Sequence, residues 1–182
     1  DEEFDNPLGI STGAAAIFGA TGGVMEAALR TAVETLTKEE LPDLKFDDVR
    51  GLEGIKEASY DVAGMTINVA VASGTSNAKK LMEKIKSGEK DYHFVEIMGC
   101  PGGCVNGGGM PQVSDRIKSS INVAEKRASA LYTMDEAMTL RKSHENPAIK
   151  HLYEDFFEKP GSSKAHEILH TSYVKKQINK HM

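Results

Sequence analysis

The sequence predicts an α/β fold built on a parallel βαβ unit. Residues 66–72 (TINVAVA) place a β-branched side chain at every second position, as half-buried strands do. Residues 78–85 then present one apolar face at helical spacing before Gly88, and residues 92–98 (YHFVEIM) form a second strand. A strand, a helix and a strand in so short a stretch almost always cross over right-handed, which makes the two strands parallel.

The segment before this unit adds a glycine-rich turn and an amphipathic helix. Residues 18–23 (FGATGG) lead into apolar side chains at helical spacing over residues 25–36, with Thr21 as the predicted N-cap. Free N–H groups at such a helix start favour an anionic ligand, although an ordinary tight turn that lets the helix pack closely explains the glycines better. Short strands are expected around residues 44–49 and 56–62.

The part of the chain after residue 115 is predicted to be helical. An apolar stripe over residues 117–131 indicates one helix, and residues 133–136 (TMDE) resemble a capping box that starts another. The pair Asn146-Pro147 supplies an N-cap and a proline at the first helical position, and a last helix is expected at about residues 163–178.

The composition is that of a soluble globular protein and narrows the choice of partners. The chain has 182 residues, a net charge of −5 and no apolar run near the roughly 20 residues that a membrane-spanning helix needs. A net acidic chain argues against nucleic acid as a general partner, because phosphates require a basic face. The first residues carry no secretory signal pattern, so a cytoplasmic location is expected.

The two cysteines indicate part of a metal site. Cys100 and Cys104 are the only cysteines, and a single bridge between them would not form a disulfide framework. Tetrahedral zinc sites and cubane iron–sulfur clusters take four protein ligands. This chain supplies at most two thiolates to either kind of site.

The loop that holds these cysteines is the strongest functional signal. Residues 99–111 (GCPGGCVNGGGMP) are rich in glycine and follow the carboxyl end of the second strand, where ligands bind in open α/β sheets. Glycines let the backbone approach a bulky ligand, and their N–H groups can donate hydrogen bonds to cluster sulfurs. The alternative is a flexible loop with two incidental thiols.

A third motif suggests zinc but fits poorly. Residues 166–170 (HEILH) match the H-E-x-x-H pattern of zinc peptidases on a predicted helix. That chemistry needs a third ligand, and no Asp or Glu follows His170. A zinc peptidase is therefore the weakest interpretation, and stoichiometric zinc that is lost in a His166→Ala variant would be needed to support it.

Taken together, two motifs resemble the catalytic domain of iron-only (FeFe) hydrogenases. They are FGATGGVMEAALRTA at residues 18–32 and HFVEIMGCPGGCVNGGGMPQ at residues 93–112. Residues 152–173 (LYEDFFEKPGSSKAHEILHTSY) resemble the tail of that domain, which is a separate small subunit in some relatives, and this tail contains the HEILH motif. The fold implied is α/β, with one lobe of the iron-hydrogenase catalytic domain, a parallel βαβ core and a helical C-terminal tail.

This resemblance implies an H-cluster in the complete enzyme. The H-cluster is a 4Fe-4S cubane joined to a diiron subcluster that carries CO, cyanide and a bridging dithiolate. By position, Cys100 corresponds to a cubane ligand and Cys104 to the cysteine that bridges the two subclusters. Met98 and Phe18 correspond to residues that line the diiron pocket; without the resemblance, Met98 would be read as a core side chain.

The sequence also departs from the family pattern. Met110 stands where the family usually has Gln. The two upstream motifs are absent from this chain, and with them the other two cluster cysteines, the lysine that contacts a cyanide and the proton-transfer cysteine. The resemblance therefore implies the C-terminal portion of a hydrogenase that reversibly reduces protons to H2 and is inactive alone.

The expected organisation and partners follow from that family. Residues 1–114 correspond to the C-terminal lobe of the large subunit, and residues 115–182 to a helical tail resembling the small subunit. Expected partners are an N-terminal half or another subunit with the remaining cluster cysteines, and ferredoxin or another electron carrier. The alternative function is a hydrogenase-like iron–sulfur assembly factor without the diiron unit, which shares a similar cysteine loop.

Overall fold

The computed structural model describes residue 2 and residues 9–175, which form parts of two compact units. The main unit is residues 10–146, and the C-terminal unit comprises residues 147–182 with residues 1–9. The main unit holds the sheet and both cysteines. The predicted boundary after residue 114 concerns family segments rather than compact units, and it stays a prediction.

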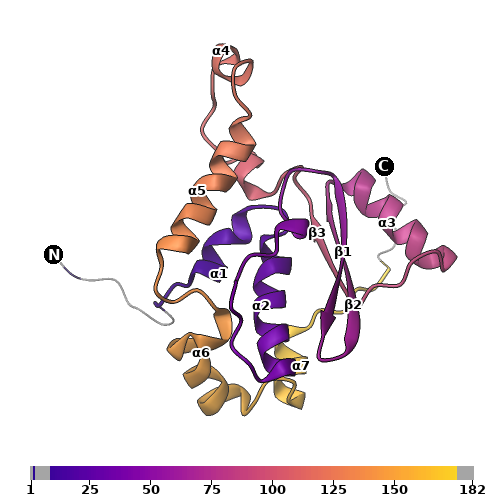
Figure 1. Ribbon diagram of the computed structural model, residues 1–182, viewed down its shortest axis with the longest axis vertical. Coiled ribbons are helices and arrows are strands. Elements are labelled where there is room, and N and C mark those ends of the chain that lie inside the picture. The colour runs from indigo at the N-terminus through magenta and orange to yellow at the C-terminus, as the bar shows by residue number, and fades with distance from the viewer. Residues whose placement is uncertain (1, 3–8, 176–182) are drawn as a thin grey trace, which may run out of the picture. The chain divides into compact units, whose positions relative to one another are not determined.

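The main unit contains a three-stranded mixed sheet in the order β1-β2-β3 (Figure 1). Strand β1 (Ile55–Val62) pairs antiparallel with β2 (Met65–Ser73), and β2 pairs in parallel with β3 (Phe94–Met98). Helix α3 (Thr75–Ser87) connects β2 to β3 and ends at Gly88, which has a left-handed φ of 73°. The predicted βαβ unit and the strand near residues 56–62 are confirmed.

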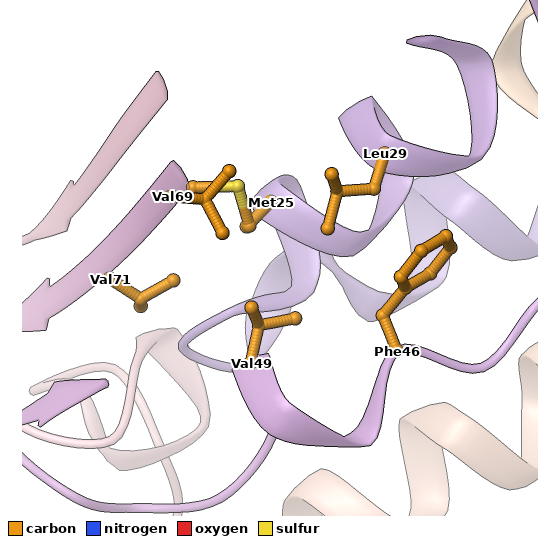
Figure 2. Packing of buried hydrophobic residues seen from close by; sticks show 6 residues of the cluster. All are labelled: Met25, Leu29, Phe46, Val49, Val69 and Val71. Atoms are coloured by element: carbon orange, nitrogen blue, oxygen red, sulfur yellow. The ribbon is translucent and has the colours of Figure 1, made fainter. Parts of the chain in front are cut away.

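Strand β2 is the centre of the core because both of its faces are covered. Val69 and Val71 pack with residues of helix α2 (Gly23–Thr37) and the segment that follows it, as Figure 2 shows. The alternate residues Ala70 and Ala72 pack with Leu81 of α3 on the other face. All four β2 side chains are fully buried, as expected for a strand between two helices.

The segment around residues 44–49 is not the predicted strand. It contains a 3-10 helix, η2 (Asp47–Val49), and Phe46 and Val49 both enter the core cluster against α2. Their spacing of three places both side chains on one side of a 3-10 turn, whereas a strand would need a spacing of two. The two aspartates between them are poor strand formers, which agrees with this outcome.

Three short helical elements flank these layers in the main unit. Helix α1 (Gly13–Ala16) is followed by the 3-10 turn η1 (Ile17–Gly19), which leads to α2. The 3-10 turn η4 (Ser143–Glu145) closes the unit.

The predicted helix over residues 117–131 is interrupted. Helix α4 (Asp115–Lys118) lies on an extended segment beyond one end of α5 (Val123–Ala137), as Figure 1 shows. The side chain of Asn122 accepts a hydrogen bond from the N–H of Glu125 at 3.2 Å and so caps a new helix. The capping box predicted at residues 133–136 is wrong, because α5 continues through it.

A buried ion-pair network joins α2 to α5 through Asp135, which is a residue of the predicted capping box. Arg30 donates hydrogen bonds to Glu26 at 2.7 Å and to both Asp135 oxygens at 2.8 Å, and all three side chains are fully buried. Arg50 also pairs with Glu26, and Arg141 with Asp135. Burial alone would raise the pKa of Asp135, but the hydrogen bonds from Arg30 and Arg141 hold it below its usual value.

The C-terminal unit is helical where it is described. Helix α6 (Pro147–Leu152) begins at the predicted proline and runs into a π-helix, η5 (Tyr153–Phe157). Helix α7 (Ser163–Leu169) is capped by Ser162 and is shorter than predicted, and residues 176–178 of the predicted helix lie outside the described residues. Over the described ranges, no helix is both long and apolar enough to cross a membrane.

Candidate metal-binding loop

The cysteine loop begins directly after β3 and is held by its own backbone. Gly103 N–H donates to the carbonyl of Cys100 at 3.0 Å, and Gly107 N–H donates to the carbonyl of Cys104 at 2.9 Å. Cys104 starts the 3-10 turn η3 (Cys104–Asn106). Both cysteines are free thiols exposed to solvent, so both sulfur atoms are available as metal ligands.

The cysteine loop packs backbone to backbone against the first glycine-rich turn. The N–H of Thr21 donates to the carbonyl of Gly102 at 3.1 Å. A Cβ on Gly103 would lie 2.7 Å from the carbonyl oxygen of Gly19 and from the nitrogen of Thr21, closer than real Cβ atoms come. The two segments singled out by sequence, residues 18–23 and 99–111, are therefore packed directly against each other.

We expect Gly103→Ala to destabilise this contact. Gly103 has a φ of 98°, and an added Cβ would meet fixed backbone atoms rather than a flexible side chain. Such backbone strain costs about 1–3 kcal/mol before the clash is added. Urea unfolding of the two variants measures the loss, and Gly108→Ala is the matched control because nothing lies within 4 Å of its Cβ. Equal losses in the two variants would contradict the close packing.

One predicted pocket residue lies on the first of these segments, and the other lies directly before the second. Phe18 lies in η1 with 43% of its surface exposed, and Met98 is the last residue of β3 and is half-buried. The carbonyl of Met98 accepts a hydrogen bond from the N–H of Gly74, which fixes the start of the cysteine loop at the edge of the βαβ unit. The exposed Phe18 side chain is therefore an apolar group on the turn that packs against the cysteine loop.

Thr21 is not the N-cap that the sequence predicts. Gly22, with a φ of 91°, occupies the N-cap position of α2, and it has no side chain to cap the helix. The Thr21 hydroxyl is buried and has no hydrogen-bond partner among the described residues. The free N–H groups of α2 are instead satisfied from β3.

Glu96 supplies this cap and was missed by sequence reasoning. Its Oε1 accepts from the N–H of Gly22 and its Oε2 from the N–H of Met25, both at 2.7 Å. Glu96 is 6% exposed and pairs with Val71 within the sheet. A carboxylate at a helix N-terminus is favoured by the helix dipole. A glutamate within an apolar strand was the only available signal.

Lys56 is a second buried charged residue at the same place. Its Nζ donates to the carbonyl of Gly51 at 2.8 Å and to the carbonyl of Thr21 at 3.1 Å. Burial lowers the pKa of Lys56 to about 8, and the nearby Glu96 opposes that shift. Lys56 therefore ties β1 to the first glycine-rich turn.

The HEILH motif belongs to the C-terminal unit, whereas the groups described above belong to the main unit. His166 and His170 are exposed on α7, and their Nδ1 atoms lie 3.3 Å apart. Among the described residues, they are not part of any group of three metal-ligating side chains. The third ligand that a zinc peptidase needs is therefore missing from the described part of the chain.

One cluster of metal-ligating types was not anticipated. Glu34, His144 and Glu145 bring ligand atoms within 4.8 Å of one another. Lys142 donates to Glu34 at 2.8 Å and to Glu145 at 3.1 Å, while His144 hydrogen-bonds to Glu34 at 2.9 Å. The Lys142 ammonium already pairs with both carboxylates, so the cluster is accounted for as an ion-pair network.

Comparisons with known proteins identify the family of this chain. A family profile described as "Iron only hydrogenase large subunit, C-terminal domain" matches residues 1–108, and one described as "Iron hydrogenase small subunit" matches residues 121–176. Iron hydrogenase 1 of Clostridium pasteurianum is 50% identical over 175 residues, which are 96% of this chain and 30% of that protein.

Two further relatives show the range of this similarity. A variant of FeFe-hydrogenase HydA1 from Chlamydomonas reinhardtii aligns with a TM-score of 0.68 and 44% identity, over 96% of this chain and 49% of that chain. A probable cytosolic Fe-S cluster assembly factor of Drosophila ananassae is 35% identical over 156 residues, which are 84% of this chain and 31% of that protein.

The fold, the thiol pair and these matches define an α/β domain of the iron-only hydrogenase class. The chain belongs to the iron-only hydrogenase family and corresponds to the C-terminal part of its catalytic domain. It spans about 30% of the length of the curated relatives it matches. Its donor set of two exposed thiols fits two of the four ligands of an iron–sulfur cubane.

Proposed function

We propose that the chain is the C-terminal part of an FeFe hydrogenase that reversibly reduces protons to H2 at an H-cluster. The observation that carries this proposal is the pair of free, exposed thiols on a loop that is hydrogen-bonded to the FGATGG turn. In the proposal, Cys100 is a cubane ligand, and Cys104 is the cysteine that bridges the cubane to the diiron subcluster. Phe18 and Met98 line the pocket.

The chain's own residues would hold and shield the cofactor. The H-cluster would supply the redox and proton chemistry of hydrogen, as cofactors generally do. The two thiolates would anchor it, while Phe18 and Met98 would keep water from its diiron end. The backbone N–H groups of the glycine loop are the available donors for hydrogen bonds that tune a cluster's potential.

A second candidate is an iron–sulfur assembly factor that lacks the diiron unit. The observation that favours it is the similarity to the Drosophila ananassae assembly factor over 84% of this chain. The TGGVMEAALR helix start and the position of Met98 favour the hydrogenase. Infrared bands of iron-bound CO and cyanide separate the two candidates, because the assembly factor would carry neither ligand.

The proposed partners follow from the ligands that this chain does not supply. The remaining cluster cysteines come from an N-terminal half or another subunit, and ferredoxin or another carrier exchanges electrons with it. No nucleic acid is proposed, given the net charge of −5. A cytoplasmic location is part of the proposal, and fractionation of the source cells tests it.

Reconstitution tests the proposed function directly. The purified chain alone, treated with iron, sulfide and a diiron precursor, is expected to evolve no hydrogen, because two thiolates cannot complete the cubane. Activity and the CO and cyanide bands are expected only after addition of a chain that carries the two other cysteines. Hydrogen evolution by this chain alone would contradict the proposal that its cluster site is incomplete. A complex that binds iron and sulfide but shows no CO or cyanide bands would favour the assembly factor.

Met98→Leu separates a pocket role from a packing role. The change conserves volume, so it is expected to cost under about 1.5 kcal/mol of unfolding free energy. In the complete enzyme it should nevertheless change the turnover rate or the sensitivity to an inhibitor such as CO, because it alters the pocket wall. Met82→Leu is the matched control, since Met82 lies on α3 outside the two site segments. Identical kinetics for the two variants would show that Met98 is a packing side chain with no role in the pocket.

A further inference from the structure

The proposed site requires two chain segments to keep a fixed position relative to each other. Phe18 precedes the start of α2, whereas Met98 and both cysteines follow β3. The segments contact each other directly through the hydrogen bond from Thr21 to the carbonyl of Gly102, the close packing of Gly103, and a buried apolar cluster that contains Ala20 and Val105. Glu96 adds a link of another kind.

The Glu96 carboxylate reaches across from the strand to the helix. It lies two residues before Met98, and each of its oxygens accepts one N–H group at the first turn of α2, at 2.7 Å. Both bonds are buried and span more than 70 positions of the sequence. The N-cap residue of this helix has no side chain to satisfy the same donors. The helix start is therefore held by the strand that carries the cysteine loop.

Only a carboxylate can make both bonds. A glutamine of the same shape has one oxygen acceptor, and its NH2 group would face the second N–H group as donor against donor. Lys56 adds to this arrangement, because its ammonium is fixed by the carbonyls of Thr21 and Gly51 and attracts the Glu96 carboxylate. The pair joins β1, β3 and the start of α2 around the first glycine-rich turn.

We propose that Glu96 is a positioning residue for the metal site: its two-oxygen clamp on the start of α2 sets the placement of the Phe18 turn against the cysteine loop. This inference rests on the proposed function for its consequences at the cofactor. The clamp itself involves only residues of this chain. Its loss would let the two segments shift while each thiol ligand stays in place.

The first arm of the test uses the 182-residue chain without metal. In Glu96→Gln, amide hydrogen exchange at Gly22 and Met25 is expected to become faster by about 10–100-fold, the loss expected when hydrogen bonds to a charged group are removed. Glu57→Gln is the matched control. Glu57 is also a strand carboxylate, but it accepts from Tyr92 and Lys84 on the other face of the sheet. That variant should leave exchange at Gly22 and Met25 unchanged.

The second arm uses the complex with the cysteine-bearing partner chain. Glu96→Gln is expected to retain the cluster and to shift its CO and cyanide infrared bands, whereas Glu57→Gln leaves the bands in place. Unchanged exchange at Gly22 and Met25, or unchanged bands in a cluster-loaded Glu96→Gln complex, overturns the inference. If the wild-type complex shows no bands, the proposed hydrogenase function fails instead, and the exchange arm alone decides whether the clamp exists.

Should Glu96→Gln fail to fold, Lys56→Met replaces it in both arms. Removing the lysine leaves both clamp bonds but takes away the charge that supports them. Exchange at Gly22 and Met25 should then rise clearly above that of Glu57→Gln. Exchange equal to that of Glu57→Gln would overturn the clamp.

Discussion

Cys104→Ser is expected to abolish retention of the diiron subcluster in the complex with the cysteine-bearing partner chain. A serine hydroxyl is a hard and poorly ionised ligand for iron, so it cannot replace a bridging thiolate. The CO and cyanide bands should disappear and hydrogen evolution should fall to background. That loss exceeds the about 10–100-fold decrease typical of residues that only support a ligand.

Met110→Gln is the control for this loop. It restores the residue that the family usually has at this position, and it should keep the bands and the activity. Unfolding midpoints of the two variants in the absence of metal should match that of the unmodified chain, since Cys104 is exposed. Full activity and intact bands in Cys104→Ser would show that the cysteine has been assigned the wrong role.

Arg30→Met is expected to cause the largest loss of stability in this chain. It leaves the fully buried carboxylates of Glu26 and Asp135 without their shared partner. Breaking a buried ion pair by removing one member costs about 3–5 kcal/mol. Arg50 still pairs with Glu26 and Arg141 with Asp135, so we expect the lower end of that range, about 3 kcal/mol. Equilibrium urea unfolding at neutral pH, followed by circular dichroism, measures the difference.

An exposed ion pair provides the comparison. Lys45 and Glu136 also connect the segment after α2 with α5, at 2.8 Å, but both side chains are more than two-fifths exposed. Lys45→Met should leave the unfolding midpoint unchanged within error, because exposed pairs contribute little. A similar response of both variants would mean that the buried network is no more important than a surface contact.

The periodic parts of the fold could be predicted from sequence because their patterns report burial directly. The alternation in residues 66–72 correctly predicted β2. The apolar face of residues 78–85 correctly predicted α3, which ends at Gly88. The strand predicted at residues 44–49 failed because Phe46 and Val49 face the core from a 3-10 turn. The helix break near Asn122 and the continuation through Asp135 depend on a local cap and on an ion pair with distant Arg30.

The site was predicted only in part, for a similar reason. Cysteine spacing and glycine content are local signals, and they located the loop and the turn that packs against it. Glu96 and Lys56 are recognised only when the sheet register places them beneath the start of α2, which no local pattern specifies. The roles of Cys100, Cys104, Met98 and Phe18 toward a cluster stay predictions.

The Arg30 network also bears on how the family can divide its chain. The large-subunit profile ends at residue 108 and the small-subunit profile begins at residue 121, on either side of α4. Asp135 and Arg141 lie in the second segment and form an ion pair with each other. Asp135 also pairs with Arg30 of the first segment. In addition, the N–H groups of Gly13 and Ala14 donate hydrogen bonds to the carbonyls of residues 140 and 141. The two segments are thus held together by buried ion pairs and backbone hydrogen bonds, so we expect them to stay associated if the chain is cut within α4. One gene or two could encode the same framework.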